Sequence, residues 1–414
     1  MTDEQGQPLP GAHVVVLELQ EATVTDAEGR YRIADLPPGT YRIRVSFVGY
    51  EDEWVKTSVP EGVERVIVNV QMQRRVFELD ELVVRGTRAD ALTPFTYVNL
   101  EREELEPQNL GVDVPFLLQW TPSAVVTSDA GTGIGYTGMW IRGSDPTRIN
   151  VTINGIPLND AESQGVYWVD LPDFASSASS IQIQRGVGTS TNGAGAFGAT
   201  INLNTLELNE EPYGEASLGA GSYNTWRGNV RFGSGLLHDR YVIEGRMSAT
   251  HSDGYIDRAR ADLKSAYLSA ARLTDKSSLR FTGFTGHEIT YQAWYGVPVQ
   301  YVDDPELRRY NPAGTEKAGE PYDDEVDNYT QTHLQLHYTR ELNRNWDLNL
   351  AAHYTRGYGF YEQYKADEDF GDYGFEPIEL LTAYWPLQTL PETIEGYVQT
   401  PGLSVYTMPA IQPG

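Results

Sequence analysis

From about residue 213, apolar and polar side chains alternate along the chain in segments of roughly ten residues, the length of strands that cross a membrane. In the first segment, Trp226, Val230 and Phe232 lie on one face, and Arg227 and Arg231 lie on the other. The same period of two recurs at 241–250, 333–338 and 346–354. This period indicates β-strands. Two structures satisfy it: a transmembrane β-barrel, and a soluble β-sandwich with one solvated face.

The connections between these segments favour the barrel. Residues 274–277 form a tight turn, whereas 287–328 are long and irregular. Short turns at one end and long loops at the other are typical of outer-membrane barrels. No stretch approaches the ~20 apolar residues of a membrane helix, so strands are the spanning elements that the sequence offers.

Charge and composition argue against several classes of function. The net charge is −27, and nucleic acid is not expected as a partner because phosphate binding needs a basic face. The chain has no cysteine, which excludes disulfides and cysteine metal sites. His333 and His337 are four residues apart, but on a strand this spacing only places both in one row. We find no nucleophile elbow either, so we expect no resident metal, no cofactor and no enzyme.

Residues 1–72 have the pattern of a small β-sandwich. Alternating runs at 29–33 and 40–45 are separated by a turn at 36–39, and a run at 66–70 closes the unit. Its motifs are, in order, Pro10-Gly11-Ala12, Thr25-Asp26, Gly29-Arg30-Tyr31 and Leu36-Pro37-Pro38-Gly39-Thr40-Tyr41. This pattern resembles the carboxypeptidase-regulatory-like, or transthyretin-like, domain.

Residues 91–207 form a second unit in which strands at 148–153, 181–185 and 200–204 mix with short helical signals near 100–105 and 112–120. Its motifs are Gly138-Met139-Trp140-Ile141-Arg142-Gly143, Ile153-Asn154-Gly155-Ile156-Pro157-Leu158-Asn159-Asp160, Ile181-Gln182-Ile183-Gln184-Arg185-Gly186 and Gly193-Ala194-Gly195-Ala196-Phe197-Gly198. Their order and spacing over about 79–207 resemble the plug domain of TonB-dependent receptors, and are most similar to siderophore and iron-complex receptors.

The glycines of the last motif also satisfy G-x-G-x-x-G, a dinucleotide fingerprint. That chemistry needs a helix after the glycines to hold the pyrophosphate. Here 199–204 has the pattern of a strand. We therefore interpret the glycines as positions where the backbone passes close to neighbouring chain.

The resemblance, with the alternating segments, predicts a mainly β chain. A transthyretin-like β-sandwich at 1–72 and a linker at 73–90 precede an α+β plug domain at 91–207, and the first strands of an antiparallel transmembrane β-barrel occupy 213–414. Barrels of the plugged class have about 22 strands. The residues after the plug suffice for fewer, and the chain begins inside the first motif, so we expect it to be truncated at both ends.

Within the linker, the resemblance places a TonB box, the segment gripped by an energy-transducing TonB-type protein. The segment is β-prone at its centre, and such a run can add as a strand to the edge of a partner's sheet. A plain connecting strand is the alternative. The predicted box is Leu79, Asp80, Glu81, Leu82, Val83, Val84, Arg85 and Gly86.

Arg142 and Arg185 each end a strand and precede a glycine. They could be ordinary surface cations. In the family that the plug resembles, such arginines pair with carboxylates on the inner wall of the barrel. A guanidinium with five donors suits that role, so we expect Arg142 and Arg185 to dock the plug.

The long connection after 287 is rich in aromatic and acidic residues, a composition suited to ligand capture, although it also suits a lid with no ligand contact. The candidate ligand residues are Tyr291, Trp294, Tyr295, Tyr301 and Tyr310. By resemblance we expect TonB-dependent transport of a ferric siderophore or other iron complex across the bacterial outer membrane, with membrane lipid as a further partner. The alternatives are a glycan importer of the starch-utilisation type and a surface-binding β-protein without transport.

Overall fold

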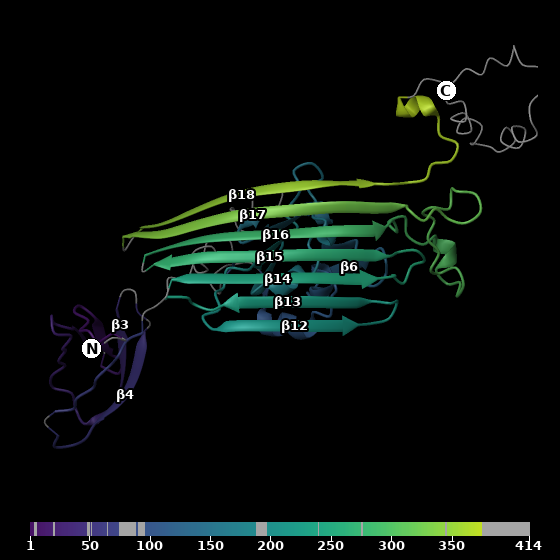
Figure 1. The fold of residues 1–414 in the computed structure, drawn as a ribbon. Coiled ribbons are helices and arrows are strands. Elements are labelled where there is room, and N and C mark those ends of the chain that lie inside the picture. The colour runs from purple at the N-terminus through teal and green to yellow at the C-terminus, as the bar shows by residue number, and fades with distance from the viewer. Residues whose placement is uncertain are drawn as a thin grey trace, which may run out of the picture.

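The computed structural model contains three units (Figure 1): an N-terminal module, an α+β domain and a long antiparallel sheet. It describes residues 1–3, 6–19, 21–47, 50, 52–63, 65–73, 88–89, 96–187, 197–238, 240–274, 276–343 and 346–374. None of the helices in these ranges has the length and apolar character needed to cross a bilayer.

The N-terminal module is a four-stranded antiparallel sheet around its own apolar core. The strand order is β2 (Glu21–Val24), β1 (His13–Val16), β3 (Gly39–Ser46) and β4 (Glu53–Val59). Alternate residues of β3, Tyr41, Ile43 and Val45, face the core. The expected strands at 29–33 and 66–70 are not formed, and that expectation is wrong. The two segments still meet, since Tyr31 donates a hydrogen bond to the Val68 carbonyl at 2.9 Å.

The second unit is the α+β domain expected from the sequence. Its sheet runs β5 (Thr96–Glu101), β10 (Ser180–Arg185), β11 (Ala199–Asn204), β8 (Ile149–Ile153) and β9 (Ile156–Pro157), with β11 and β8 parallel. A hairpin of β6 (Ala124–Ser128) and β7 (Thr137–Ile141) stands apart. The helices are single turns: α2 (Arg102–Leu105), η1 (Glu106–Gln108), α3 (Val114–Leu117), η2 (Pro146–Arg148), η3 (Trp168–Asp170) and η4 (Phe174–Ser177).

The third unit is a seven-stranded sheet in which every strand pairs antiparallel with the next along the chain. The strands are β12 (Pro212–Ala220), β13 (Trp226–Ser234), β14 (Tyr241–Ser252), β15 (Ala261–Thr274), β16 (Ser277–Tyr291), β17 (Val326–Asn343) and β18 (Trp346–Tyr361). They are 9 to 18 residues long, so most exceed the expected ten. The tight turn at 274–277 is confirmed. The long loop is shorter than expected, because β16 continues to Tyr291 and β17 begins at Val326.

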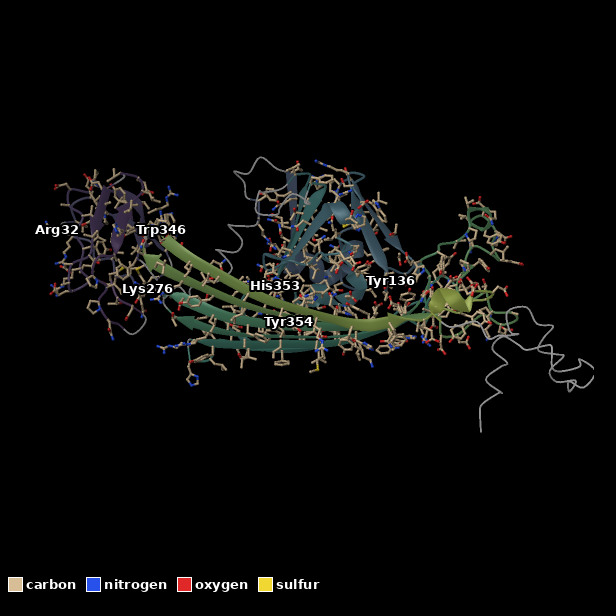
Figure 2. All side chains as sticks on the ribbon, turned by 90° about the horizontal axis from the view of Figure 1, so that it is seen from above. Arg32, Tyr136, Lys276, Trp346, His353 and Tyr354 are labelled. Atoms are coloured by element: carbon tan, nitrogen blue, oxygen red, sulfur yellow. The ribbon has the colours of Figure 1, made fainter. Side chains whose placement is uncertain are left out.

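The two faces of this sheet differ as the alternation predicts. On the outer face, Val230 is 54% exposed and Met247 is 69% exposed. On the inner face, Tyr267 and Phe284 are buried in the same core cluster as the second unit's strands. Figure 2 shows the sheet as a curved layer with that unit on its concave side. In the described residues, the polar face of the sheet therefore packs on the preceding unit and has no dry core of its own, unlike the inner face of a sandwich.

Candidate functional site

The contact between the second unit and the concave face of the sheet is organised around one carboxylate, Asp173. It lies between η3 and η4 in a left-handed conformation (φ 53°), which Asp tolerates better than most residues. Its Oδ1 accepts from Arg227 Nη2 at 2.6 Å, and its Oδ2 accepts from Asn229 Nδ2 at 2.5 Å and Arg246 Nη1 at 3.3 Å. Burial raises the pKa of Asp173, but Arg246 and Arg227 outweigh burial, and the net pKa lies below the ordinary value. Asp173 is therefore an anion gripped from two strands.

Two further arginines of the sheet hold the second unit at its edges. Arg231 on β13 pairs with Glu106 of η1 and with Glu215 of β12. Arg280 on β16 is 1% exposed, and it donates from Nη2 to the Thr205 carbonyl at 2.8 Å. Cationic donors on the inner wall thus grip carboxyl and carbonyl oxygens of the second unit.

The sequence reasoning did not anticipate this arrangement, in which the wall supplies the arginines. The residues predicted for docking, Arg142 and Arg185, lie elsewhere. Arg142 donates to the Arg185 carbonyl at 3.2 Å, and Arg185 donates to the Pro122 carbonyl at 3.2 Å. Both bonds stay inside the second unit. Among the described residues, neither arginine pairs with a carboxylate of the sheet. The docking role of Arg142 and Arg185 therefore stays a prediction.

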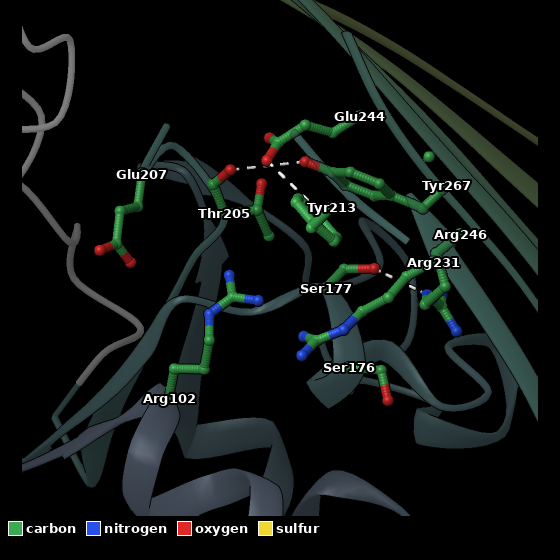
Figure 3. Close-up of a pocket in the computed structure, with 11 residues that line it drawn as sticks. Arg102, Ser176, Ser177, Thr205, Glu207, Tyr213, Arg231, Glu244, Arg246 and Tyr267 are labelled. Atoms are coloured by element: carbon green, nitrogen blue, oxygen red, sulfur yellow. Dashed lines mark hydrogen bonds between the residues drawn. The ribbon is translucent and has the colours of Figure 1, made fainter. Parts of the chain in front are cut away.

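Figure 3 shows a small polar cavity between the second unit and the sheet. Arg102 lines it from the second unit, and Arg231, Glu244 and Arg246 line it from strands β13 and β14. Its volume is about 20 Å³, which is room for about one water molecule. The cavity is too small for a ligand.

At the far end of the sheet, the long loop meets the hairpin connection of β6 and β7. Tyr136 on that connection donates a hydrogen bond to Asp327 at the start of β17. Its ring packs edge-on against Trp294, with centroids 5.7 Å apart. Trp294 in turn contacts Tyr295, and the two side chains are 38% and 54% exposed. These residues form an open aromatic surface at the rim of the interface.

The other loop candidates have different surroundings. Tyr291 is 7% exposed, and its hydroxyl donates to the Tyr322 carbonyl at 2.5 Å. Tyr301 and Tyr310 pack edge-on, with centroids 5.5 Å apart. Tyr291 therefore holds the loop's own backbone, whereas Trp294 and Tyr295 offer ring surface to solvent.

Beneath the aromatic rim lies a group of carboxylates with little exposure to solvent. Asp113 and Asp170 of the second unit and Glu288 of β16 are buried, and Asp327 of β17 is half-buried. Burial, with a smaller contribution from Asp327, raises the pKa of Asp170 to about 7. Burial also raises the pKa of Asp113 well above its usual range. Among the described residues, no set of three or more acidic or histidine side chains has the geometry to hold a metal.

Two predicted sequence motifs lie wholly or partly outside the described residues. The predicted TonB box, Leu79 to Gly86, lies outside them, as do Gly193 and Gly195 of the nucleotide-like motif. Gly198 is described: a Cβ there would lie 2.6 Å from Ser144 Cβ, and strand β11 follows it directly. Close backbone passage is therefore confirmed at Gly198, and a strand stands where a dinucleotide site needs a helix.

Comparison with known families agrees with this architecture. The carboxypeptidase-regulatory-like domain matches residues 1–84, and the TonB-dependent receptor plug domain matches residues 89–200. Residues 89–200 are therefore a plug domain of the kind found in TonB-dependent receptors. The second unit is their plug, and the seven-stranded sheet is the wall on which the plug sits. This family consists of receptors and not of enzymes.

Individual relatives match parts of the chain. A TonB-dependent receptor, P39, of Formosa agariphila is 32% identical over 144 residues, covering 34% of this chain and 13% of its own length. The ferric-pyoverdine 358 receptor of Pseudomonas putida is 25% identical over 274 residues, covering 63% of this chain and 31% of its own. The structure of Pseudomonas aeruginosa FpvA bound to a heterologous pyoverdine superposes with a TM-score of 0.50 at 16% identity, covering 64% of this chain and 34% of that one. The chain thus spans about a third or less of these relatives, and the last likeness concerns the fold alone.

Proposed function

We propose that the protein is an outer-membrane receptor that imports a scarce ligand, with a TonB-type protein supplying the energy. One observation carries the proposal. The plug packs on the polar face of a sheet whose other face exposes Val230, Met247 and Leu350. An apolar outer face suits lipid, and a plugged inner face suits a gated passage.

The ligand that we propose is a ferric siderophore or another iron complex. The supporting relative is the ferric-pyoverdine 358 receptor, which shares 25% identity with this chain. The aromatic surface of Trp294 and Tyr295, beside Tyr136 of the plug, is the proposed first contact. Tyr301 and Tyr310 extend it along the loop, and Tyr291 supports it from below.

The energy-coupling segment that we propose is Leu79 to Gly86. It joins the N-terminal module to the plug, so a partner that gripped it could pull directly on the plug. Its core, Leu82 to Val84, suits strand addition to a partner's sheet edge. Arg142 and Arg185 remain proposed docking residues for wall carboxylates.

Growth of a strain deleted for the gene tests the transport proposal. Complementation should restore growth on ferric siderophores or iron chelates and leave growth on glycans unchanged. Rescue confined to a glycan would replace the proposed ligand class. Recovery of the protein from the soluble periplasm, with no outer-membrane fraction, would replace transport with binding alone.

A variant pair tests the coupling segment separately. Val83→Pro removes a backbone N–H and blocks strand pairing, whereas Val83→Ile keeps it. Val83→Pro should abolish uptake while leaving ligand binding to whole cells unchanged, and Val83→Ile should behave as the natural protein. Uptake by the proline variant at the natural rate would overturn the assignment of this segment.

A further inference from the structure

The outer face of the sheet carries an apolar groove of about 450 Å³ near the turns that lead into β14 and β16. Its wall on one side comes from Leu237, Tyr241 and Ile243, and on the other from Leu279, Phe281 and Leu336. This volume is many times the ~10–15 Å³ that one water molecule needs by the same measure. The groove is therefore large enough for part of an extended hydrocarbon chain, such as one fatty-acyl chain.

The groove follows from the strand register. Ala270 on β15 lies directly between Ile243 on β14 and Phe281 on β16. A small side chain between two large ones leaves a furrow at Ala270, because side chains on one face of a sheet stand side by side. All three residues point to the face that the plug does not cover, because the inner-face positions of these strands are the buried ones.

One end of the groove is cationic. Arg272 lies two positions from Ala270 on the same face, and His238 lines the groove beside it. Arg272 is exposed, and no ion pair with a carboxylate is recorded for it in the described part of the chain. In the paired row across the sheet, Tyr241 and Leu279 flank Arg272, and Tyr338 follows Leu279. Tyrosines in such a row mark the interface of a bilayer, where headgroups lie.

We propose that this groove binds a phospholipid with an acidic headgroup from the periplasmic leaflet. One acyl chain lies over Ala270 between Ile243 and Phe281, and the phosphate accepts from Arg272, with His238 beside it. The commitment to an acidic lipid rests on charge. The chain has a net charge of −27, yet at this rim of an apolar furrow Arg272 has no carboxylate partner among the residues that the structure describes. The inference rests on the proposed membrane location of the sheet.

The test uses the detergent-purified protein and native mass spectrometry with added phosphatidylglycerol or phosphatidylethanolamine. The natural protein should retain phosphatidylglycerol preferentially. Arg272→Gln should reduce that preference about fivefold. Lys264→Gln is the matched control, since Lys264 is an exposed residue of the same strand outside the groove, and it should change nothing.

A second pair of variants tests the furrow itself. Ala270→Phe should abolish retention of both lipids, while Ala266→Phe, at an outward position of β15 that does not line the groove, should leave retention unchanged. Equal loss in each variant and its control would overturn the proposal. The proposal would also be overturned if light scattering showed that the natural protein is a dimer and that Ala270→Phe converts it to a monomer, because a second copy of the chain would then occupy the groove.

Fractionation separates this inference from the proposed function. If the protein is not recovered in the outer-membrane fraction, the proposed function is wrong, and so is the assignment of a lipid to the groove. A membrane-inserted receptor that retains neither lipid would overturn the groove assignment alone.

Discussion

Asp173 of the plug and Arg246 of the wall are 0% and 3% exposed at their side chains, and their charged atoms approach to 3.3 Å. A buried ion pair adds little net stability by itself, because both charges lost their water. Arg227 and Asn229 complete the shell of donors on the same carboxylate. The Asp173 carboxylate therefore holds the plug here, and its removal would leave the buried Arg246 and Arg227 without a counter-charge.

Replacing that carboxylate should loosen the plug. Asp173→Ala leaves Arg227 and Arg246 unpaired, and breaking a buried pair costs roughly 3–5 kcal/mol. We expect a lower calorimetric unfolding temperature and faster amide exchange across η3 and η4. Glu162→Ala, at an exposed plug position, is the control and should leave both measurements unchanged. An equal effect of the two substitutions would contradict the role given to Asp173.

A glycine of the wall sets the distance to the plug. A Cβ on Gly286 of β16 would lie 2.0 Å from the Asp170 carbonyl oxygen and 2.7 Å from Pro172 Cδ. Gly286→Ala should displace η3 and cost about 1–3 kcal/mol, as overpacking does. Gly214→Ala on β12 is the matched control, because nothing lies within 4 Å of its Cβ position. Spin-label distances between plug and wall should lengthen only in the first variant.

The alternation of side chains predicted the two faces of the sheet correctly for β13, β14 and β17, because period two depends only on strand geometry. It gave no view of Asp173, since a carboxylate in a turn has no periodic signature. A usable signal was present: Arg227, Arg231 and Arg246 all occupy inward positions, and inward cations need anions from the plug.

The expected strands at 29–33 and 66–70 show the opposite limit. Alternation there was real, but backbone pairing depends on tertiary neighbours that one sequence does not display. Pro37 and Pro38 follow the first run closely, and proline contributes no N–H to a ladder. The segment is held instead by the hydroxyl of Tyr31.

Asp170 should make the stability of the folded protein depend on pH. Its folded pKa of about 7 lies above the usual value near 4, so the folded protein holds a proton that the unfolded chain releases. The protonated carboxyl of Asp170 contributes on the order of 4 kcal/mol to the free energy of unfolding. This contribution is fully present below the pKa of the unfolded chain and is lost as pH rises through the folded pKa of about 7. Asp170→Asn should reduce the loss of calorimetric stability between pH 4 and pH 7, and the remaining slope comes from other buried carboxylates, including Asp113. An unchanged slope in this variant would show that other groups carry it.

Substitutions at Tyr291 and Tyr295 should distinguish a residue that stabilises the loop from a residue that contacts the ligand. Tyr291→Phe removes the hydroxyl that the Tyr322 carbonyl accepts at 2.5 Å, which costs about 1 kcal/mol, and should speed amide exchange in the loop. Tyr295→Ala removes a ring that is 54% exposed, so exchange should change little while ligand affinity falls. Isothermal titration with a ferric siderophore and exchange mass spectrometry measure the two effects independently. If Tyr295→Ala alters exchange as strongly as Tyr291→Phe and leaves affinity intact, the exposed aromatic surface is a lid and the ligand contacts lie elsewhere.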